Sequence, residues 1–293
     1  TEYVYDPAQR LIKALRSQGE SEQFAYDSTG NMVQKISGSE EILSTYGAGN
    51  QLQSSGDTKY EYDNNGRRIR KIEQASTSSP HEWIYTWDER DQLKTVTKPD
   101  GEVWEYSYDA LGRRISKKGS EKTEQFVWYG NVVIHHLVNE SEPITWLFEQ
   151  SSFRPLGKIE NDKFYSVITD HLGTPREMVD EAGKIVWSVV HKSWGLVDRT
   201  GVNEIDCQIR FQGQWFDDES GLCYNRFRYY DGEVGQFLCK DPIGLAGGLN
   251  EYKYVENPII KFDRFGLSDE QGYLFRGDNN YRRGESIGQP RSE

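Results

Sequence analysis

The sequence contains few cysteines, and their number is odd. Cys207, Cys223 and Cys239 show no paired C-x-x-C spacing. This pattern argues against a disulfide framework and against a zinc site. We therefore expect no metal site, and we expect three reduced thiols in the core of a protein made in a cytosol.

Long apolar runs and positive charge are also scarce. No apolar run approaches 18 residues and the N-terminus has no signal-peptide pattern, so no membrane span is expected. The net charge of −12 argues against a nucleic-acid-binding surface, which needs a basic patch or stripe. We interpret the longest basic run, Arg-Arg-Ile-Arg-Lys at 67–71, as a solvated strand edge.

Apolar residues make up only 35% of the chain even when tyrosine is counted. Disorder is nevertheless not expected, because the chain holds 12 Phe, 18 Tyr and 8 Trp, and disordered segments have few aromatics. Sheets with largely polar faces, pinned by aromatic cross-strand pairs, satisfy both facts. The composition therefore favours an all-β protein.

A repeat of an aromatic residue followed by aspartate runs through residues 1–130. Each copy precedes a turn and a short strand, and a degenerate copy begins at Tyr46; the full copies are Tyr5-Asp6, Tyr26-Asp27, Tyr62-Asp63, Trp87-Asp88 and Tyr108-Asp109. The aspartate can accept backbone N–H groups of the turn, and Gly30, Gly66 and Gly112 can adopt the positive φ that completes it. The repeat predicts a coiled ribbon of antiparallel hairpins whose faces are buried only against neighbours.

From residue 131 to 267 the repeat loosens, and we treat this range as a second region. His135 and His136 are adjacent, so in a strand they face opposite sides and cannot ligate one metal together. Asp170 and His171 resemble part of a hydrolase triad, but no Gly-x-Ser-x-Gly elbow exists in the chain. We therefore interpret Asp170-His171 as a structural loop.

The most informative stretch runs from Arg228 to Leu267. Asp241 and Asp263 are each followed three and four positions later by Gly-Leu. Two carboxylates brought together by folding can share a proton, one acting as general base on water and the other polarising a carbonyl. This chemistry is aspartyl-type peptide hydrolysis, and Leu267–Ser268 is the candidate bond.

A turn must bring Asp263 to that bond. An extended chain would place the Asp263 carboxylate roughly 13 Å from it, and Gly266 can supply the turn. The competing interpretation is that both aspartates only form turns, because Asp side chains before a Gly turn commonly hydrogen-bond nearby backbone.

The same stretch resembles the end of the Rhs (recombination hot spot) YD-repeat toxin core. Its motifs recur here in the family's order: Arg-Tyr-Tyr-Asp at 228–231, Asp-Pro-Ile-Gly-Leu-Ala-Gly-Gly at 241–248, Asn250, Tyr252, Tyr254 and Asn257-Pro258. The resemblance implies that Asp241 and Asp263 are catalytic aspartates, that Arg228 is their associated arginine, and that the chain cuts itself after Leu267. Two departures affect the geometry: Gly232 replaces a Pro, and Arg264-Phe265 replaces Pro-Leu.

The resemblance also implies the setting of the chain. Rhs cores wind YD repeats into a hollow shell around a variable toxin, so the expected partners are the rest of the shell, the enclosed toxin, an immunity protein and a secretion spike or chaperone. About six repeat units are too few to close such a shell, so we expect Thr1 to continue from another stretch of shell, on a separate chain or cut away. The protein is expected to be made in a bacterial cytoplasm and exported by a secretion apparatus into a target cell.

Residues 268–293 lack the repeat and are too short to fold alone, so we interpret them as the truncated or disordered start of a toxin. Leu-Phe-Arg-Gly-Asp at 274–278 resembles the first-strand motif of ADP-ribosyltransferase toxins, which implies that Arg276 helps to hold NAD in a toxin not complete here. Self-cleavage itself needs no cofactor. The alternative function is a non-catalytic YD-repeat protein of the cell surface, or one that binds carbohydrate.

Overall fold

The structure is a computed structural model that describes residues 1–139 and 141–271. A sheet of twenty strands takes up most of it. The strands of this sheet are β1 (Glu2–Tyr5), β2 (Leu11–Leu15), β3 (Glu22–Tyr26), β4 (Met32–Ser37), β5 (Glu40–Tyr46), β6 (Leu52–Ser55), β7 (Thr58–Tyr62), β8 (Arg68–Glu73), β9 (His81–Trp87), β10 (Leu93–Thr97), β11 (Val103–Tyr108), β12 (Arg114–Lys118), β13 (Thr123–Tyr129), β14 (Val132–Val138), β15 (Ile144–Phe148), β16 (Pro155–Glu160), β17 (Lys163–Thr169), β18 (Pro175–Val179), β19 (Ile185–His191) and β20 (Val197–Asn203).

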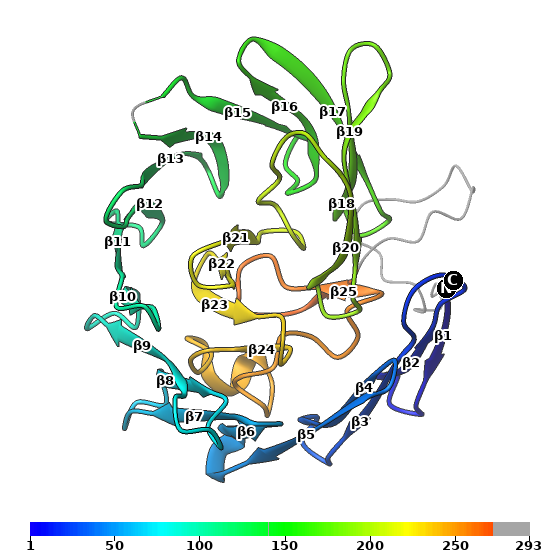
Figure 1. The fold of residues 1–293 in the computed structure, drawn as a ribbon, viewed down its shortest axis with the longest axis vertical. Helices are drawn as coiled ribbons and strands as arrows, with labels where there is room; N and C mark the ends of the chain where they lie inside the picture. The colour runs from blue at the N-terminus through cyan, green and yellow to red at the C-terminus, as the bar shows by residue number, and fades with distance from the viewer. Residues whose placement is uncertain (140, 272–293) are drawn as a thin grey trace, which may run out of the picture.

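Each of these strands pairs antiparallel with the next one in the sequence. The resulting ribbon bends into an arc, which we call the wall (β1–β20; Figure 1). The predicted coiled ribbon of hairpins is therefore confirmed. In the described ranges, no helix has the length and apolar character needed to cross a bilayer.

The remaining described residues, 204–271, lie inside the arc and are called the plug (Figure 1). They contain a four-stranded sheet and a two-stranded sheet. The plug elements are β21 (Trp215–Asp217), β22 (Leu222–Asn225), β23 (Arg228–Asp231), β24 (Gln236–Phe237), the short 3-10 helix η2 (Gly244–Gly247), β25 (Lys261–Phe262) and β26 (Glu270–Gln271); a second 3-10 helix, η1 (Ala48–Asn50), belongs to the wall.

One turn geometry recurs along the wall, as the repeat predicted. Asp109 Oδ1 accepts the backbone N–H groups of Leu111 and Arg113, both at 2.9 Å, and Asp109 Oδ2 accepts Arg113 Nε at 2.7 Å. Gly112 completes the turn at φ +75°. The same pair of backbone bonds to Oδ1 forms at Asp6, Asp27, Asp63, Asp88, Asp170 and Asp180.

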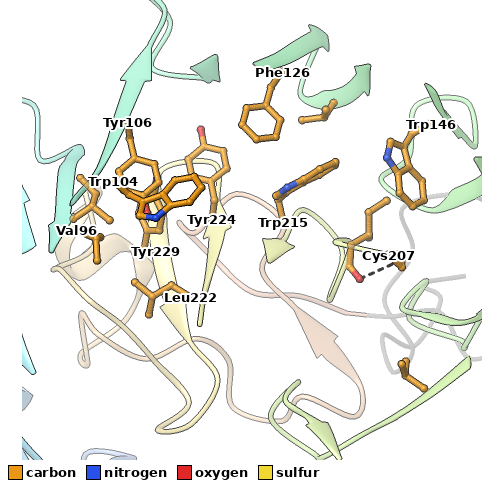
Figure 2. Close-up of a cluster of buried hydrophobic side chains, with 14 of the residues drawn as sticks. Val96, Trp104, Tyr106, Phe126, Trp146, Cys207, Trp215, Leu222, Tyr224 and Tyr229 are labelled. Atoms are coloured by element: carbon orange, nitrogen blue, oxygen red, sulfur yellow. Dashed lines mark hydrogen bonds between the residues drawn. The ribbon is translucent and has the colours of Figure 1, made fainter. Parts of the chain in front are cut away.

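The main core lies between the wall and the plug. Along β11 the side chains alternate, so that Trp104 and Tyr106 are buried while their neighbours are exposed. Figure 2 shows such wall aromatics meeting plug aromatics. The rings of Tyr106 and Tyr229 lie 5.8 Å apart, and those of Phe126 and Trp215 lie 5.4 Å apart. Burying one face of the wall against a small plug explains how a chain with few apolar residues acquires a core.

The two ends of the arc meet through side chains. Arg16, just after β2, donates to Glu22 at 2.8 Å and to the His191 carbonyl oxygen at 3.0 Å. Glu22 also accepts the Ser193 backbone N–H at 2.9 Å and its hydroxyl at 2.7 Å. The β2–β3 hairpin therefore touches the β19–β20 hairpin, and the wall closes around the plug.

The basic run at 67–71 corrects one expectation. Arg68 is fully buried and donates to Asp231 of the plug at 2.7 Å, and Lys71 is buried and donates to Glu233 at 2.8 Å. The interpretation as a solvated strand edge is therefore wrong for these two residues, although Arg70 is partly exposed and pairs with Glu82. The physical reason is that the plug brings carboxylates to the inner face of β8, and an ion pair makes burial of a cation tolerable.

The predicted boundary at residue 131 falls in the turn between β13 and β14, which pair with each other in the same sheet. The architecture changes after β20 instead, where the chain leaves the wall for the plug (Figure 1). The three cysteines lie in the plug as buried free thiols. Burial raises the pKa of Cys207 to about 11 and the pKa values of Cys223 and Cys239 to about 12.

Candidate functional site

Arg228 lies at the start of β23 and is 2% exposed. Its guanidinium donates in three directions: Nη2 to Asp241 Oδ2 at 2.8 Å, Nη1 to the Glu251 carbonyl oxygen at 2.8 Å, and Nε to the Gly266 carbonyl oxygen at 2.6 Å. The guanidinium carbon lies 3.7 Å from the centroid of the Phe237 ring. The fork geometry of arginine thus connects three separate segments of the plug.

Asp241 follows β24 and precedes η2. Its Oδ1 accepts the Ile243 backbone N–H at 2.9 Å, while Oδ2 faces Arg228. Burial raises the pKa of Asp241, and the Arg228 guanidinium opposes that rise. The carboxylate is therefore held in place by a turn on one oxygen and by a cation on the other.

Asp263 follows β25 and is 1% exposed. Its Oδ1 accepts the backbone N–H groups of Phe265 at 3.2 Å, Gly266 at 2.8 Å and Leu267 at 3.0 Å. Gly266 has φ +72°, so the turn expected from the sequence is present. Within the described ranges Asp263 Oδ2 accepts no hydrogen bond, and it lies 3.6 Å from Arg228 Nη2.

The two carboxylates thus converge on one nitrogen atom, Arg228 Nη2. Burial raises the pKa of Asp263 to about 6, because the loss of water outweighs the backbone bonds to Oδ1 and the charge of Arg228. Asp241 is closer to the cation than Asp263 is. Asp263 is therefore the member of the pair that more readily keeps a proton.

The bond after Leu267 lies beside this pair. A Cβ atom built on Gly247 would collide with Asp241 Oδ2 and would lie 2.7 Å from the Leu267 carbonyl oxygen. The carboxylate and the carbonyl therefore face the same narrow gap, which only a glycine at 247 leaves open. Ser268, on the other side of the candidate bond, is exposed.

A pocket of about 120 Å³ lies next to the site. Its lining includes Phe227 and Tyr229, which flank Arg228, and Pro242, which follows Asp241. Roughly 10–15 Å³ of such space holds one water molecule, so this pocket can hold several, although Asp241 and Asp263 do not line it.

The departures from the Rhs pattern are accommodated without loss of the turn. Phe265 packs edge-on against Phe153 of the β15–β16 loop, with ring centroids 5.3 Å apart, and the Arg264 guanidinium lies 5.4 Å from the centroid of the Phe153 ring. Gly213 lies directly against the Arg264 carbonyl, where no side chain would fit. Gly232 follows the buried Asp231 and packs near Trp194.

Other sequence candidates lie away from this site. Asp170 Oδ2 accepts Arg176 Nη2 at 2.8 Å, and His171 Nε2 lies 2.7 Å from the Ile259 carbonyl oxygen. These contacts agree with the interpretation of Asp170-His171 as a structural loop. Arg276 lies outside the described residues.

Sequence reasoning missed the charged contacts between wall and plug. Arg114 is buried and pairs with Asp217, just as Arg68 pairs with Asp231. Lys117 is also buried, with Asp217 and Glu219 as partners. One signal was present: Arg68 and Arg114 occupy the same position in the repeated Gly-Arg-Arg-Ile sequence.

Comparison with known families places the chain. The sequence profile described as Teneurin YD-shell matches residues 1–277. The chain belongs to this family. It is a segment of a YD-repeat toxin shell of the Rhs type, in agreement with the resemblance of its motifs.

Curated members with similar sequences include several bacterial toxins. The probable deoxyribonuclease RhsB of Dickeya dadantii is 34% identical over 301 residues, covering 91% of this chain and 21% of that protein. The double-stranded DNA deaminase toxin A of Burkholderia cenocepacia is 33% identical, covering 92% of this chain and 21% of that protein. The chain thus spans about a fifth of the length of these curated relatives.

Solved structures share the fold. The crystal structure of TcdB2-TccC3-TEV matches with a TM-score of 0.55 at 20% identity, over 91% of this chain and 18% of that one. The Tc holotoxin pore of Photorhabdus luminescens matches with a TM-score of 0.53 at 18% identity, over 94% of this chain and 18% of that one. At these identities the likeness concerns the shell fold alone.

Proposed function

We propose that this chain forms part of a shell that encloses a toxin, and that it releases the toxin by aspartyl-type self-cleavage after Leu267. The observation that carries the proposal is the convergence of two buried carboxylates, Asp241 and Asp263, on Arg228 beside the Leu267 carbonyl. A turn aspartate of the wall, Asp63, also shares a cation with a second carboxylate, because Arg67 pairs with both Asp63 and Asp91, but that group is more exposed than the one at Arg228.

The proposed reaction is hydrolysis of the Leu267–Ser268 peptide bond. Asp241, ionised beside Arg228, takes a proton from a water molecule whose oxygen attacks the Leu267 carbonyl carbon, while protonated Asp263 gives its proton to the carbonyl oxygen. The C–N bond then breaks as Asp241 passes its proton to the Ser268 nitrogen and Asp263 recovers a proton from the collapsing intermediate. The products are a Leu267 carboxyl group and a Ser268 amine.

Tethering makes a slow site sufficient. The bond belongs to the same chain as the carboxylates, and well-oriented intramolecular groups reach effective molarities of about 10⁵ M or more. Each molecule needs one turnover only. A site in which only a minor fraction of Asp263 is protonated at neutral pH therefore still completes the reaction.

The proposed setting follows from the family. Relatives named as a deoxyribonuclease and a DNA deaminase toxin imply that different toxins occupy the same shell, so we propose a toxin downstream of Leu267 without assigning its target. Its partners would be the rest of the shell, an immunity protein and a secretion spike or chaperone. The proposed route is synthesis in a bacterial cytoplasm and export into a target cell. If the toxin is an ADP-ribosyltransferase, Arg276 would contact NAD.

The test is intact mass under denaturing conditions of the full-length protein, for the parent, for Asp241→Asn and for Asp180→Asn. The parent and Asp180→Asn are expected to split between Leu267 and Ser268, because Asp180 Oδ1 accepts backbone bonds of its own turn in the wall. Asp241→Asn is expected to stay whole. A parent that stays whole would reject self-cleavage, and binding to glycans would then be measured for the alternative, a non-catalytic surface protein.

A further inference from the structure

The plug contacts the wall at five of its repeat turns, those of Asp6, Asp27, Asp63, Asp109 and Asp170. Plug side chains donate hydrogen bonds to backbone carbonyl oxygens two or three residues after the turn aspartate. The bonds are Asn257 Nδ2 to the Gln9 oxygen at 3.0 Å, Asn250 Nδ2 to the Thr29 oxygen at 3.4 Å, Tyr252 Oη to the Gly66 oxygen at 2.7 Å, Arg226 Nη1 to the Gly112 oxygen at 2.8 Å, and Gln212 Nε2 to the Leu172 oxygen at 2.6 Å.

Two of these contacts flank a residue of the candidate site. Glu251, whose carbonyl oxygen accepts Arg228 Nη1, lies between Asn250 and Tyr252 in the sequence. Asn250 Nδ2 also donates to Asn31 Oδ1 of the wall at 2.7 Å. The carbonyl that orients Arg228 is therefore held on both sides by turns of the wall.

The plug offers few other constraints on that carbonyl. The Phe237 N–H donates to the Tyr252 carbonyl oxygen at 2.8 Å, and Asn250 Oδ1 accepts the Tyr252 N–H at 3.2 Å. Both bonds join plug to plug, so they set the local backbone shape. The position of residues 250–252 relative to the wall depends on the contacts to the turns at Asn31 and Gly66, together with the Tyr62 ring and Gln51 Nε2, which pack against and donate to Tyr252.

We propose that docking of Asn250 and Tyr252 on these two wall turns positions Arg228, so that the Leu267–Ser268 bond is cut only after the wall has closed around the plug. The inference rests on the proposed self-cleavage and adds a condition to it. Asn250 and Tyr252 are positioning residues, acting through the Glu251 carbonyl. Contacts with the wall thereby control the reaction at a site whose residues all belong to the plug.

A pair of glycines separates this contact from strain in the turn. Gly66 and Gly183 occupy the same position in two wall turns and share φ +82°. A Cβ on Gly66 would lie 2.5 Å from Tyr252 Oη and 2.7 Å from the flexible end of the Lys240 side chain, whereas a Cβ on Gly183 would meet nothing within 4 Å. Gly66→Ala and Gly183→Ala therefore strain the backbone equally, and only Gly66→Ala displaces Tyr252.

The experiment measures the rate of cleavage after Leu267 in the full-length protein, by intact mass at timed intervals after synthesis. Gly66→Ala is expected to slow cleavage by about tenfold or more, because small misplacements of a positioned group carry large rate costs. Gly183→Ala is expected to stay within about twofold of the parent, as for a substitution away from contacts. Equal cleavage rates for the two variants would overturn the inference.

A second pair removes a hydroxyl. Tyr252→Phe deletes the bond to the Gly66 oxygen and a longer one, at 3.4 Å, accepted from Gln51 Nε2, and Tyr26→Phe deletes a bond of 2.7 Å to the Leu11 oxygen within the wall. Tyr252→Phe is expected to slow cleavage by about tenfold while Tyr26→Phe does not. Gly66→Ala combined with Tyr252→Phe is expected to be no slower than the slower single variant, because both changes break one contact.

The outcomes also separate this inference from the proposed function. If Asp241→Asn stays whole but Gly66→Ala and Tyr252→Phe cleave like the parent, self-cleavage stands. The proposed requirement for docking on the wall turns is then rejected. If the effects of Gly66→Ala and Tyr252→Phe multiply, they act independently and the inference also fails. If the parent does not cleave, both proposals fall.

Discussion

The turns at Asp109 and Asp263 are built alike and behave differently. In both, one carboxylate oxygen accepts the backbone N–H groups two and four residues later, and a glycine three residues later has positive φ. They differ at the fourth position, which is Arg113 in the wall and Leu267 in the plug. In the repeat turn the fourth residue, Arg113, is a cation that pairs with the turn aspartate. In the plug turn the fourth residue is Leu267, which precedes the candidate bond.

The pKa values of the two carboxyl groups are shifted in opposite directions. Slight burial raises the pKa of Asp109, but the Arg113 N–H and guanidinium outweigh it, so the pKa is lowered overall. For Asp263, burial dominates and raises the pKa to about 6. The comparison teaches that a structural turn becomes a candidate proton donor when it is buried and loses its local cation.

The largest contrast is expected in cleavage. Asp263→Asn removes the proposed proton donor and should slow cleavage at Leu267 by about 10³-fold, within the range for a positioned acid or base. Asp109→Asn should leave the rate unchanged, because the hydrogen bonds that the Asp109 carboxylate accepts from Leu111 and Arg113 all lie within its own turn. Intact mass over time measures both. Similar rates for the two variants would mean that Asp263 is only a turn former.

Adjacent arginines extend the contrast to stability. Arg114→Leu leaves the buried Asp217 with Lys117 as its remaining cation, so we expect a loss of about 3 kcal/mol in the free energy of unfolding. Arg113→Leu removes a partly exposed pair with Asp109 and should cost less than about 1 kcal/mol. Denaturant titrations in an Asp241→Asn background, which keeps the chain whole, measure both values. Equal losses would show that wall and plug do not depend on the buried pair.

The rate of cleavage should fall as pH rises through about 6, because Asp263 must carry a proton. Between pH 6 and pH 8 the protonated fraction, and with it the rate, should decrease roughly fiftyfold. On the acid side the rate should fall when Asp241 becomes protonated. A rate that rises with pH across this window would contradict the assignment of Asp263 as the proton donor.

The smallest effect concerns stability against pH. A carboxyl whose pKa is raised on folding stabilises the fold fully below its unfolded pKa, and that stability is lost as pH rises through the folded value, here about 6. In the Asp241→Asn background, Asp263→Asn should therefore reduce the fall in stability between pH 4 and pH 7, by on the order of 2 kcal/mol. Asp109→Asn should act in the opposite sense, since the lowered pKa of Asp109 adds stability that is lost toward acid pH.

Local features of this molecule could be predicted from sequence, and distant contacts could not. The turns at Asp27, Asp63 and Asp109 follow from residues within four positions of each other, so spacing alone predicted them. The burial of Arg68 depends on Asp231, which lies 163 positions away, and no local pattern signals such a partner.

The candidate site contains both kinds of feature, some predictable from local sequence and some not. The turn from Asp263 to Leu267 is local and was expected. The place of Arg228 between the two carboxylates was implied only by resemblance to a family. The Gly247 gap was not foreseen, because it depends on three segments meeting. Residues 250 and 252 were noticed as motif members, yet their contacts with wall turns needed the folded chain.

The strictly sequential pairing of the wall strands bears on the order of events during translation. A hairpin that pairs only with its predecessor can form as soon as it leaves the ribosome, since it waits for no later part of the chain. The residues of the plug are synthesised after the wall that surrounds them, and Leu267 follows both aspartates. The wall is therefore synthesised before the plug that it encloses, and the Leu267–Ser268 bond is synthesised after both carboxylates.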